Sequence, residues 1–321
     1  MSRKITKKII NTPESCVDDN LRGIVALYPK LQLYPKHRVV TYRRKDDSGR
    51  VAILGGGGSG HEPFAAGGVL VLLGNYTGDR LNFGKAFEKA KIAGIKVEGF
   101  IVGEDVASSH NKTGGRSMSG EVFLFKMCGA MSAKGKDLYF IRDTAAEVNK
   151  NMATLGVCLS ACSLPGQPPL FETDPDKMEL GIGVHGEAGI QKLKLGTAKE
   201  TVTMLLDKIV EHLSLKVGNR VAAMINNLDK KQIKMERLYS GHLKTSLEMH
   251  GFQITFLHLN KQNGDIWLEL LDEPTDAVAW TGGVMSMRDD NYDDDNGDDD
   301  TLLQSDVKKV SLIVIFIIIV E

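Results

Sequence analysis

Cysteine is scarce in this chain of 321 residues, and its scarcity limits the classes of protein to consider. Four cysteines, Cys16, Cys128, Cys158 and Cys162, are too few for a disulfide framework, and no basic-then-apolar signal segment opens the sequence. We therefore expect a reducing, cytoplasmic setting. No second pair of cysteines or histidines stands at zinc-like spacing from Cys158 and Cys162, so we expect packing residues there and no metal site.

An excess of charge of one sign is also missing. The chain has 40 Lys and Arg against 41 Asp and Glu, for a net charge of −1, so it has no overall field to attract nucleic acid or an anionic membrane. Eight of the acidic residues lie between Asp289 and Asp300, which leaves the rest of the chain mildly basic. We expect no nucleic-acid partner.

A long hydrophobic run is the third absence. Leu312–Val320 is nine residues of unbroken apolar sequence, whereas a helix that spans a membrane needs roughly twenty. We interpret this run as an artefactual or alternative terminus, and membrane anchoring is the less favoured alternative. The acidic stretch before it has too little apolar surface to order itself. We therefore predict a domain over residues 7–280, an acidic disordered linker over 281–308 and a short apolar tail over 309–321.

What the chain does contain is the alternating pattern of an α/β protein. Hydrophobic residues make up 42% of it, enough for a core, and many of its 34 glycines follow apolar runs, as in strand-to-helix turns. A capping box of Thr197 and Glu200 opens one helix. The patterns predict strands over 50–54, 95–102, 157–164, 220–225 and 252–259, and helices over 81–93, 120–133, 137–155, 197–213 and 233–248. Ligands are then expected at the carboxyl ends of the strands.

The segment Gly55–Pro63 is the first candidate site. Its consecutive glycines let the backbone approach a ligand that a side chain would block, and they place His61 at the rim. A tight turn without a ligand is the simpler alternative. Gly55, Gly57 and Gly60 also fit the loose G-x-G-x-x-G pattern of dinucleotide sites, but the proline and glycines that follow disfavour the long helix this pattern requires.

Two further segments carry candidate catalytic groups. His185 lies in the glycine-rich segment Gly181–Gly189, where the crowded glycines expose both faces of the ring to a small substrate; a satisfied core or surface histidine is the alternative. Asp79 lies in Asn75–Phe83, at a strand-to-helix junction where a carboxylate could face a substrate hydroxyl. A structural role for Asp79, capping the following helix, is the alternative.

In this order, the motifs GGGSGHEP, NYTGDRLNFG and ELGIGVHGEAG resemble the substrate-binding K domain of dihydroxyacetone kinases, a family that includes animal triokinase/FMN cyclase. Further support comes from MATLGVCLSACSLPG, from the NNL at 226–228 and from SLEMHG followed by DEPTDAVAW. The resemblance runs from about Lys7 to Trp280. It implies an α/β fold like that of the K domain, with two α/β subdomains.

The resemblance also implies a mechanism. In this family a histidine, here His185, attacks the ketone of dihydroxyacetone and holds it as a covalent hemiaminal; glycerol is rejected because it has no electrophilic carbonyl carbon. Asp79 would accept the proton of the terminal hydroxyl during phosphorylation, with assistance from His61. The implied substrate is dihydroxyacetone or glyceraldehyde, and its pocket would be lined by Gly58, Ser59, Gly60, His61 and Asp79.

The phosphoryl donor is implied to lie outside this chain. Members of the family bind ATP and Mg²⁺ in a separate all-helical L domain, or draw phosphate from a phosphotransfer protein, and this sequence ends at the linker that would precede such a domain. The resemblance therefore implies a dihydroxyacetone kinase that needs an L domain in trans, and it suggests a homodimer. FMN cyclase activity also uses the nucleotide domain and is less favoured.

The sequence departs from the family at three places. Gly74 stands where the family has a lysine in the pattern VKNYTGD. Only residues 64–68 separate GHEP from the next apolar run, where the family carries a helix, a strand and a helix, and a further helix is missing after residue 228. We therefore predict a K-like fold with missing helix and strand elements. The alternatives are a non-catalytic binding or regulatory protein, a truncated isoform, and a chain that does not fold stably.

Overall fold

The computed structural model describes most of the predicted domain. The described residues are 11–27, 31–42, 50–56, 69–109, 112, 114–162, 168–169, 171–184, 187, 189–224, 234–239, 250–275 and 280. Four predicted site residues (Gly58, Ser59, Gly60 and His61), the predicted nucleophile His185, and the predicted linker and tail over 281–321 lie outside these residues.

The described elements alternate between helices and strands, as the sequence predicts. In chain order they are α1 (Cys16–Leu27), β1 (Leu31–Tyr34), the 3₁₀ turn η1 (Pro35–His37), β2 (Val39–Tyr42), β3 (Ala52–Gly56), β4 (Val69–Gly74), α2 (Thr77–Ile92), β5 (Val97–Val102), η2 (Val106–Ser108), α3 (Glu121–Ala133), α4 (Leu138–Lys150), β6 (Met152–Ser160), β7 (Lys177–Leu180), β8 (Gln191–Lys194), α5 (Ala198–His212), β9 (Arg220–Met224), β10 (Lys234–Tyr239), β11 (His250–Leu259) and α6 (Gly264–Asp272).

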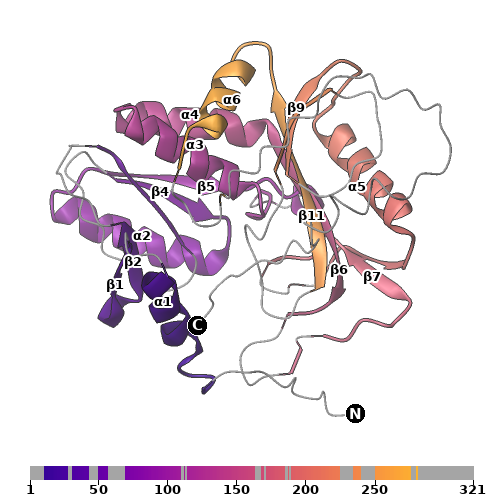
Figure 1. The fold of residues 1–321 in the computed structure, drawn as a ribbon, viewed down its shortest axis with the longest axis horizontal. Helices are drawn as coiled ribbons and strands as arrows, with labels where there is room; N and C mark the ends of the chain where they lie inside the picture. Colours follow the sequence, from indigo (N-terminus) through magenta and orange to yellow (C-terminus); the bar gives the residue numbers. More distant parts are fainter. Residues whose placement is uncertain are drawn as a thin grey trace.

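The first subdomain is a parallel three-stranded sheet, in the order β3-β4-β5, with helices on both faces (Figure 1). All six residues of β4 are buried, because the strand is apolar on both faces. Val69, Val71 and Leu73 pack with Phe83 of α2 on one face, while Leu70 and its neighbours on the other face join the core formed by α3 and α4. This two-sided burial fixes the carboxyl end of β4, where the candidate site begins.

The second subdomain is a six-stranded sheet, in the order β10-β9-β11-β6-β7-β8. Its strands are antiparallel except for the pair β9 and β10. The apolar side chains of β6, β9 and β11 on one face pack against α5, and those on the other face share a core with α3, α4 and α6. A parallel bridge between Asp105 and Thr154 joins the end of β5 to β6, so the two subdomains meet beside the site.

The structure corrects two of the predicted helices. The helix predicted over 137–155 ends at Lys150, and Met152 already begins β6. Residues 152–158 are all buried, so they show no alternation that would distinguish a strand from a buried helix. Residues 234–239, predicted as helix, form β10, because β9 offers a parallel partner; residues 240–249 lie outside the described residues. The predicted capping box of Thr197 and Glu200 is present at the start of α5.

Two connections between neighbouring parallel strands are short. Residues 57–68 join β3 to β4, and residues 225–233 join β9 to β10. A parallel crossover usually takes a dozen or more residues and contains a helix, as the connection through α2 from β4 to β5 does; residues 57–68 only just reach this length, and residues 225–233 fall below it. The two short connections coincide with the two places where the sequence predicts that elements of the family fold are missing.

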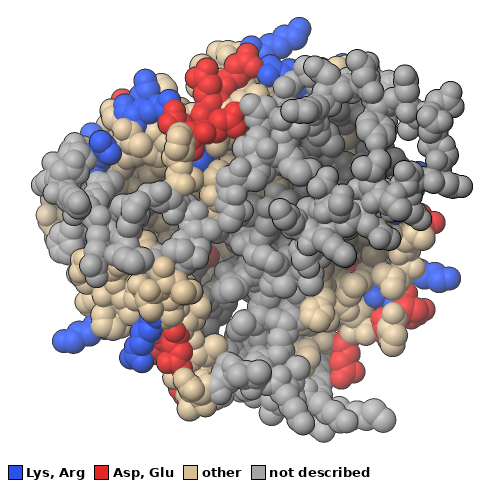
Figure 2. Space-filling view, viewed as in Figure 1, with Lys and Arg blue, Asp and Glu red and all other residues tan. Residues whose placement is uncertain are grey.

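The charged surface agrees with the balanced composition. Lys and Arg side chains lie beside Asp and Glu side chains around the described part of the face shown in Figure 2. Several of them pair, as Arg142 does with Glu98 and Asp143. Within the described elements, no helix combines the length and the apolar character that crossing a membrane would require.

Candidate functional site

Asp79 lies just after β4, the central strand of the first sheet, where the chain enters α2. It belongs to the first turn of α2 and is 6% exposed. The helix N-cap is Tyr76, which makes no side-chain capping hydrogen bond, so the alternative role of Asp79 as the N-cap is wrong. A Cβ atom on Gly74 would lie 3.3 Å from Asp79 Oδ2 and 3.4 Å from Ser117 Cβ. The Asp79 carboxylate therefore faces the end of β4 and the loop that contains Ser117.

The residues before Asp79 bind this loop, which connects β5 to α3. Asn75 Nδ2 donates a hydrogen bond of 2.8 Å to the carbonyl oxygen of Gly115, and the Tyr76 hydroxyl donates one of 2.8 Å to the carbonyl oxygen of Ser117. Burial raises the pKa of Tyr76 well above its usual value, and the negative charge of Glu187 raises it further. Tyr76 is therefore a neutral hydrogen-bond donor that lies within reach of the charge on Glu187.

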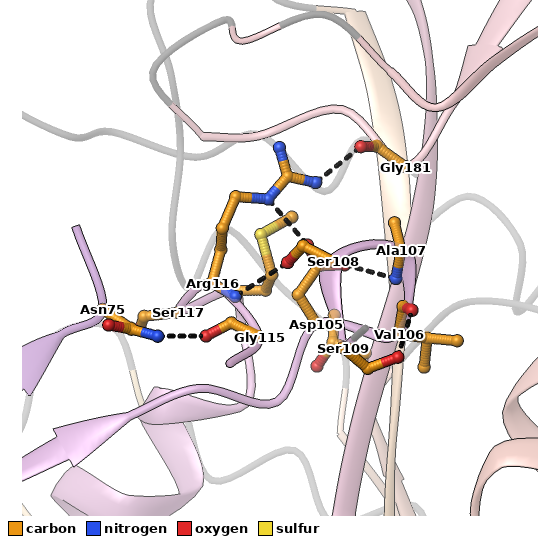
Figure 3. Close-up of polar contacts among 12 residues, drawn as sticks. Asn75, Asp105, Val106, Ala107, Ser108, Ser109, Gly115, Arg116, Ser117 and Gly181 are labelled. Atoms are coloured by element: carbon orange, nitrogen blue, oxygen red, sulfur yellow. Dashed lines mark hydrogen bonds and ion pairs between the residues drawn. The ribbon is translucent and has the colours of Figure 1, made fainter. Parts of the chain in front are cut away.

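Arg116 links this loop to the segment that precedes His185 (Figure 3). Its Nε donates a hydrogen bond of 2.7 Å to Asp105 Oδ2, and its Nη2 donates one of 2.6 Å to the carbonyl oxygen of Gly181. The Asp105 side chain is fully buried, and it also accepts hydrogen bonds from Ala107 N and Ser108 Oγ. Each of these contacts involves an ionised group, which makes them stronger than bonds between neutral partners.

Glycine is required in the His185 segment by contacts inside the protein. A Cβ atom on Gly183 would collide with the Glu187 carboxylate and lie 2.8 Å from Arg116 Nη1. A Cβ atom on Gly189 would lie 2.5 Å from the carbonyl oxygen of Leu180. The sequence interpretation, in which glycines expose a histidine ring, therefore misses a packing role: a side chain at Gly189 would meet the backbone of Leu180, whereas one at Gly183 would meet only the ends of two flexible side chains.

A buried polar network holds the loop that contains Arg116. Glu104 Oε1 accepts hydrogen bonds from the backbone amides of Met118 (2.9 Å) and Gly120 (2.8 Å). Thr154 Oγ1 lies 3.3 Å from the same oxygen and 2.8 Å from Thr255 Oγ1. Glu104 follows β5, whereas Thr154 and Thr255 belong to the second sheet. The network therefore fixes both subdomains against the loop between β5 and α3.

Sequence reasoning identified only part of this cluster. Of the predicted site residues, Asp79 is described and lies in it, while the nearest described residues to His185 are Val184, which is buried, and Glu187. Arg116 and Asp105 were missed. Their signal in the sequence is weak: a glycine pair precedes Arg116, and its first member, Gly114, has a φ of +82°.

The described residues do not fit a magnesium–nucleotide site. Among them, no group of three or more His, Cys, Asp or Glu side chains is placed to hold a metal ion. Of the carboxylates in this region, Asp105 binds the guanidinium of Arg116, and Glu104 accepts hydrogen bonds from the backbone amides of Met118 and Gly120. Burial raises the pKa of Cys162, and the charge on Glu187 raises it further, so this thiol is neutral as well. No step that uses a metal or nucleotide is therefore assigned to these residues.

Comparison with known proteins identifies the family. The model of the Dak1 domain matches residues 22–67 and 65–230. Triokinase/FMN cyclase of Bos taurus is 37% identical over 86% of this chain, and its Homo sapiens counterpart is 36% identical. The dihydroxyacetone-binding subunit DhaK of a PTS-dependent dihydroxyacetone kinase of Listeria innocua is 30% identical and is covered over its whole length. The chain belongs to the Dak1 domain family.

Solved structures show the same fold. Dihydroxyacetone kinase from C. freundii, in complex with AMP-PNP and Mg²⁺, superposes with a TM-score of 0.77 at 26% identity over 92% of this chain and 65% of that one. A dihydroxyacetone kinase operon co-activator superposes with a TM-score of 0.73 at 23% identity, over 82% of this chain and 97% of that chain. The predicted K-domain-like α/β fold is confirmed.

The matches cover part of the relatives and are interrupted within this chain. The chain spans 58% of the length of the mammalian relatives. The alignment with the bovine relative is 338 positions long, which exceeds the 321 residues of this chain, so it requires gaps here. The two parts of the family match meet at residues 65–67, inside the short connection between β3 and β4.

Proposed function

We propose that this chain is the ketose-binding part of a triose kinase, which captures dihydroxyacetone or glyceraldehyde for phosphorylation by a donor domain in trans. The observation that carries the proposal is a set of hydrogen bonds through the loop of Gly115–Ser117. Asn75 and Tyr76, shortly before Asp79, bind this loop, and Arg116 within it binds the carbonyl oxygen of Gly181, four residues before His185. The predicted base and the predicted nucleophile thus belong to segments that meet in one place.

In the proposed capture step, a nitrogen of the His185 imidazole attacks the carbonyl carbon of the substrate. The C–N bond forms as the carbonyl π bond breaks, and the oxygen takes up a proton while the other ring nitrogen gives one up. The product is a neutral hemiaminal, with no oxidation or reduction. Only an aldehyde or ketone can undergo this step, so bond formation itself discriminates against glycerol.

Asp79 then accepts the proton of the terminal hydroxyl, as that oxygen attacks a phosphoryl group supplied from outside the chain. Gly58, Ser59 and Gly60 would contact the substrate through their backbone amides, and His61 would bind a substrate hydroxyl and assist the proton transfer. The position of Asp79 supports this role, because it is buried in the first turn of α2 at the carboxyl end of β4, where ligands of α/β folds bind.

Capture can be tested by ¹³C NMR of the protein with [2-¹³C]dihydroxyacetone. We expect a bound carbon at the position of a tetrahedral hemiaminal. The signal should be absent in His185→Ala and present in His212→Ala, a control on α5 in the second subdomain. A tetrahedral signal that persists in His185→Ala, or no signal in the wild-type protein, would refute covalent capture.

The role of Asp79 needs a second measurement. Asp79→Asn should keep the captured signal but lose phosphorylation of dihydroxyacetone when a nucleotide-binding L domain of a relative, ATP and Mg²⁺ are added. Equal turnover by Asp79→Asn and wild type would exclude Asp79 as the base. Full turnover without any added domain would contradict the requirement for a donor in trans.

A non-catalytic binding protein is the second candidate, and Gly74 favours it. A side chain at this position would begin 3.3 Å from the Asp79 carboxylate, so the lysine that the family carries there would start next to Asp79, and this chain lacks its cation. If capture occurs without turnover in the reconstituted assay, and Gly74→Lys restores turnover, the natural chain binds the ketose but does not phosphorylate it. Turnover by the natural chain would remove this candidate.

A further inference from the structure

Arg116 is largely buried and connects separate segments of the site, as a surface arginine would not. Its side chain is 15% exposed, and it binds the carboxylate of Asp105 and the carbonyl oxygen of Gly181 at the same time. Its backbone is held as well: its amide donates to Ser108 Oγ (2.9 Å), and its carbonyl oxygen accepts from Glu104 N and Asp105 N. Figure 3 shows the side chain reaching from its own loop to Gly181.

The position of Gly181 gives this contact its importance. Gly181 directly follows β7 and has a φ of +71°, so it turns the chain at the point where the strand enters the segment of His185. Arg116 Nη1 lies against Gly183, where a Cβ atom would be 2.8 Å away. The guanidinium therefore contacts the segment at two points within four residues of His185.

A guanidinium suits this arrangement, and an ammonium does not. Its planar fork presents Nε to one partner and two Nη groups to others in a fixed geometry, whereas lysine offers one compact charge. Asp105 neutralises the charge, and its side chain is itself fixed by Ala107 N and Ser108 Oγ. Asp105, which follows β5, thus fixes the guanidinium of Arg116, and the guanidinium in turn binds Gly181, which follows β7.

We propose that Arg116 is a positioning residue, which fixes the backbone of Gly181–Gly183 so that His185 is presented to the substrate. The inference rests on the proposed function, because it takes His185 as the nucleophile. Arg116 itself takes no part in the capture step. Its loss should weaken capture because a displacement of about 1 Å in a reacting group lowers rates by as much as about a hundredfold.

The test compares Arg116→Ala with Arg142→Ala, a control that removes an arginine of α4 paired with Glu98 of β5 and with Asp143. Hydrogen exchange of the peptide over 181–189 measures whether the segment is held. The rate at which the ¹³C hemiaminal signal forms after dihydroxyacetone is added measures capture. We expect faster exchange in this peptide and a capture rate lowered by about tenfold or more in Arg116→Ala alone.

Chemical rescue separates positioning from a general loss of structure. Ethylguanidinium, below concentrations that unfold the protein, should restore slow exchange and capture to Arg116→Ala, while ethylammonium should not. Arg116→Lys retains the charge but not the fork, and it should resemble Arg116→Ala. If Arg116→Ala does not fold, the Lys variant supplies the same comparison with Arg142→Lys as its control.

Each outcome decides the inference. Unchanged exchange and unchanged capture in both Arg116 variants would overturn it, as would full capture by Arg116→Lys. If the wild-type protein captures no ketose, the proposed function fails, but hydrogen exchange still decides whether Arg116 holds the segment. Faster exchange with rescue would then support the positioning role without the chemistry.

Discussion

Gly103 allows the end of β5 to lie directly against the loop that contains Arg116, and Gly103→Ala tests this close approach. An ideal Cβ atom on Gly103 would collide with the carbonyl oxygen of Gly115, and it would lie 3.3 Å from Gly115 C and 3.7 Å from Asn75 Cβ. The obstacle is backbone, so no side chain can rotate away. The strand end and the loop would have to separate.

The expected loss of stability follows from that separation. Inserting a methyl group into a well-packed region costs about 1–3 kcal/mol, and the alanine recovers about 0.4–1 kcal/mol through the lower entropy of the unfolded chain. The separation would also strain the hydrogen bonds from Glu104 N and Asp105 N to the carbonyl oxygen of Arg116, both 3.2 Å long. We expect a net loss of about 1–2 kcal/mol, or roughly 2–8 °C in Tm for a domain of this size.

Urea denaturation and thermal melts of Gly103→Ala and Gly129→Ala provide the assay. Gly129 lies in α3, and a Cβ atom there would have no atom within 4 Å, so alanine should stabilise the helix by roughly 0.5–1 kcal/mol. The same substitution is thus expected to act with opposite sign at the two positions. Stability of Gly103→Ala equal to or above that of Gly129→Ala would refute the close approach. The absence of any cooperative transition in the wild type would favour a chain that does not fold stably.

Three further predictions concern features away from this contact. Thr197→Ala removes the hydroxyl that accepts from Glu200 N in the capping box of α5 and should lower the free energy of unfolding by about 1 kcal/mol in urea titrations. Burial raises the pKa of Cys128 to about 12, so iodoacetamide should modify the half-buried Cys16 in the native protein but Cys128 only after unfolding, as read by peptide mass spectrometry. Burial lowers the pKa of His258 from 6.5, so the unfolded chain binds a proton at this histidine more readily than the folded protein does. The stability that the neutral His258 contributes is therefore present above pH 6.5 and is lost as the pH falls below that value. His258→Gln should flatten this part of the curve of stability against pH.

The elements that the sequence predicts well are those with a local signal. The capping box of α5 and the glycine after α2, Gly94 with a φ of +75°, mark helix ends through short-range contacts alone. The prediction errors occur where pairing with another strand determines the secondary structure. Met152 begins a strand because β11 pairs with it, and Lys234 lies in a strand because β9 does. In each case the pairing with another strand, and not the strand's own sequence, determines its conformation, so no local pattern distinguishes these strands from helices.

The site shows the same division. Asp79 is identifiable because it lies in a motif at a strand-to-helix junction, and the structure places it there, buried. Arg116 is 65 residues from Gly181 in sequence, and its importance comes from contacts that only the fold creates. A lone arginine after a glycine pair has many common roles, so the sequence offers no reason to select it.

The short connection between β3 and β4 bears on one part of the proposed site and not on the other. Strands β3 and β4 pair in register over Ala52–Gly56 and Val69–Leu73. The short connection between them does not prevent this pairing, because the backbone hydrogen bonds join the two strands directly. Asp79 and Arg116, however, lie on the connections from β4 to α2 and from β5 to α3, outside both short connections. The shortening therefore bears on the segment of Gly58, Ser59, Gly60 and His61, within residues 57–68. Under the proposed function, capture by His185 then does not depend on His61, and His61→Ala should capture dihydroxyacetone as well as the wild type; weaker capture would contradict this division.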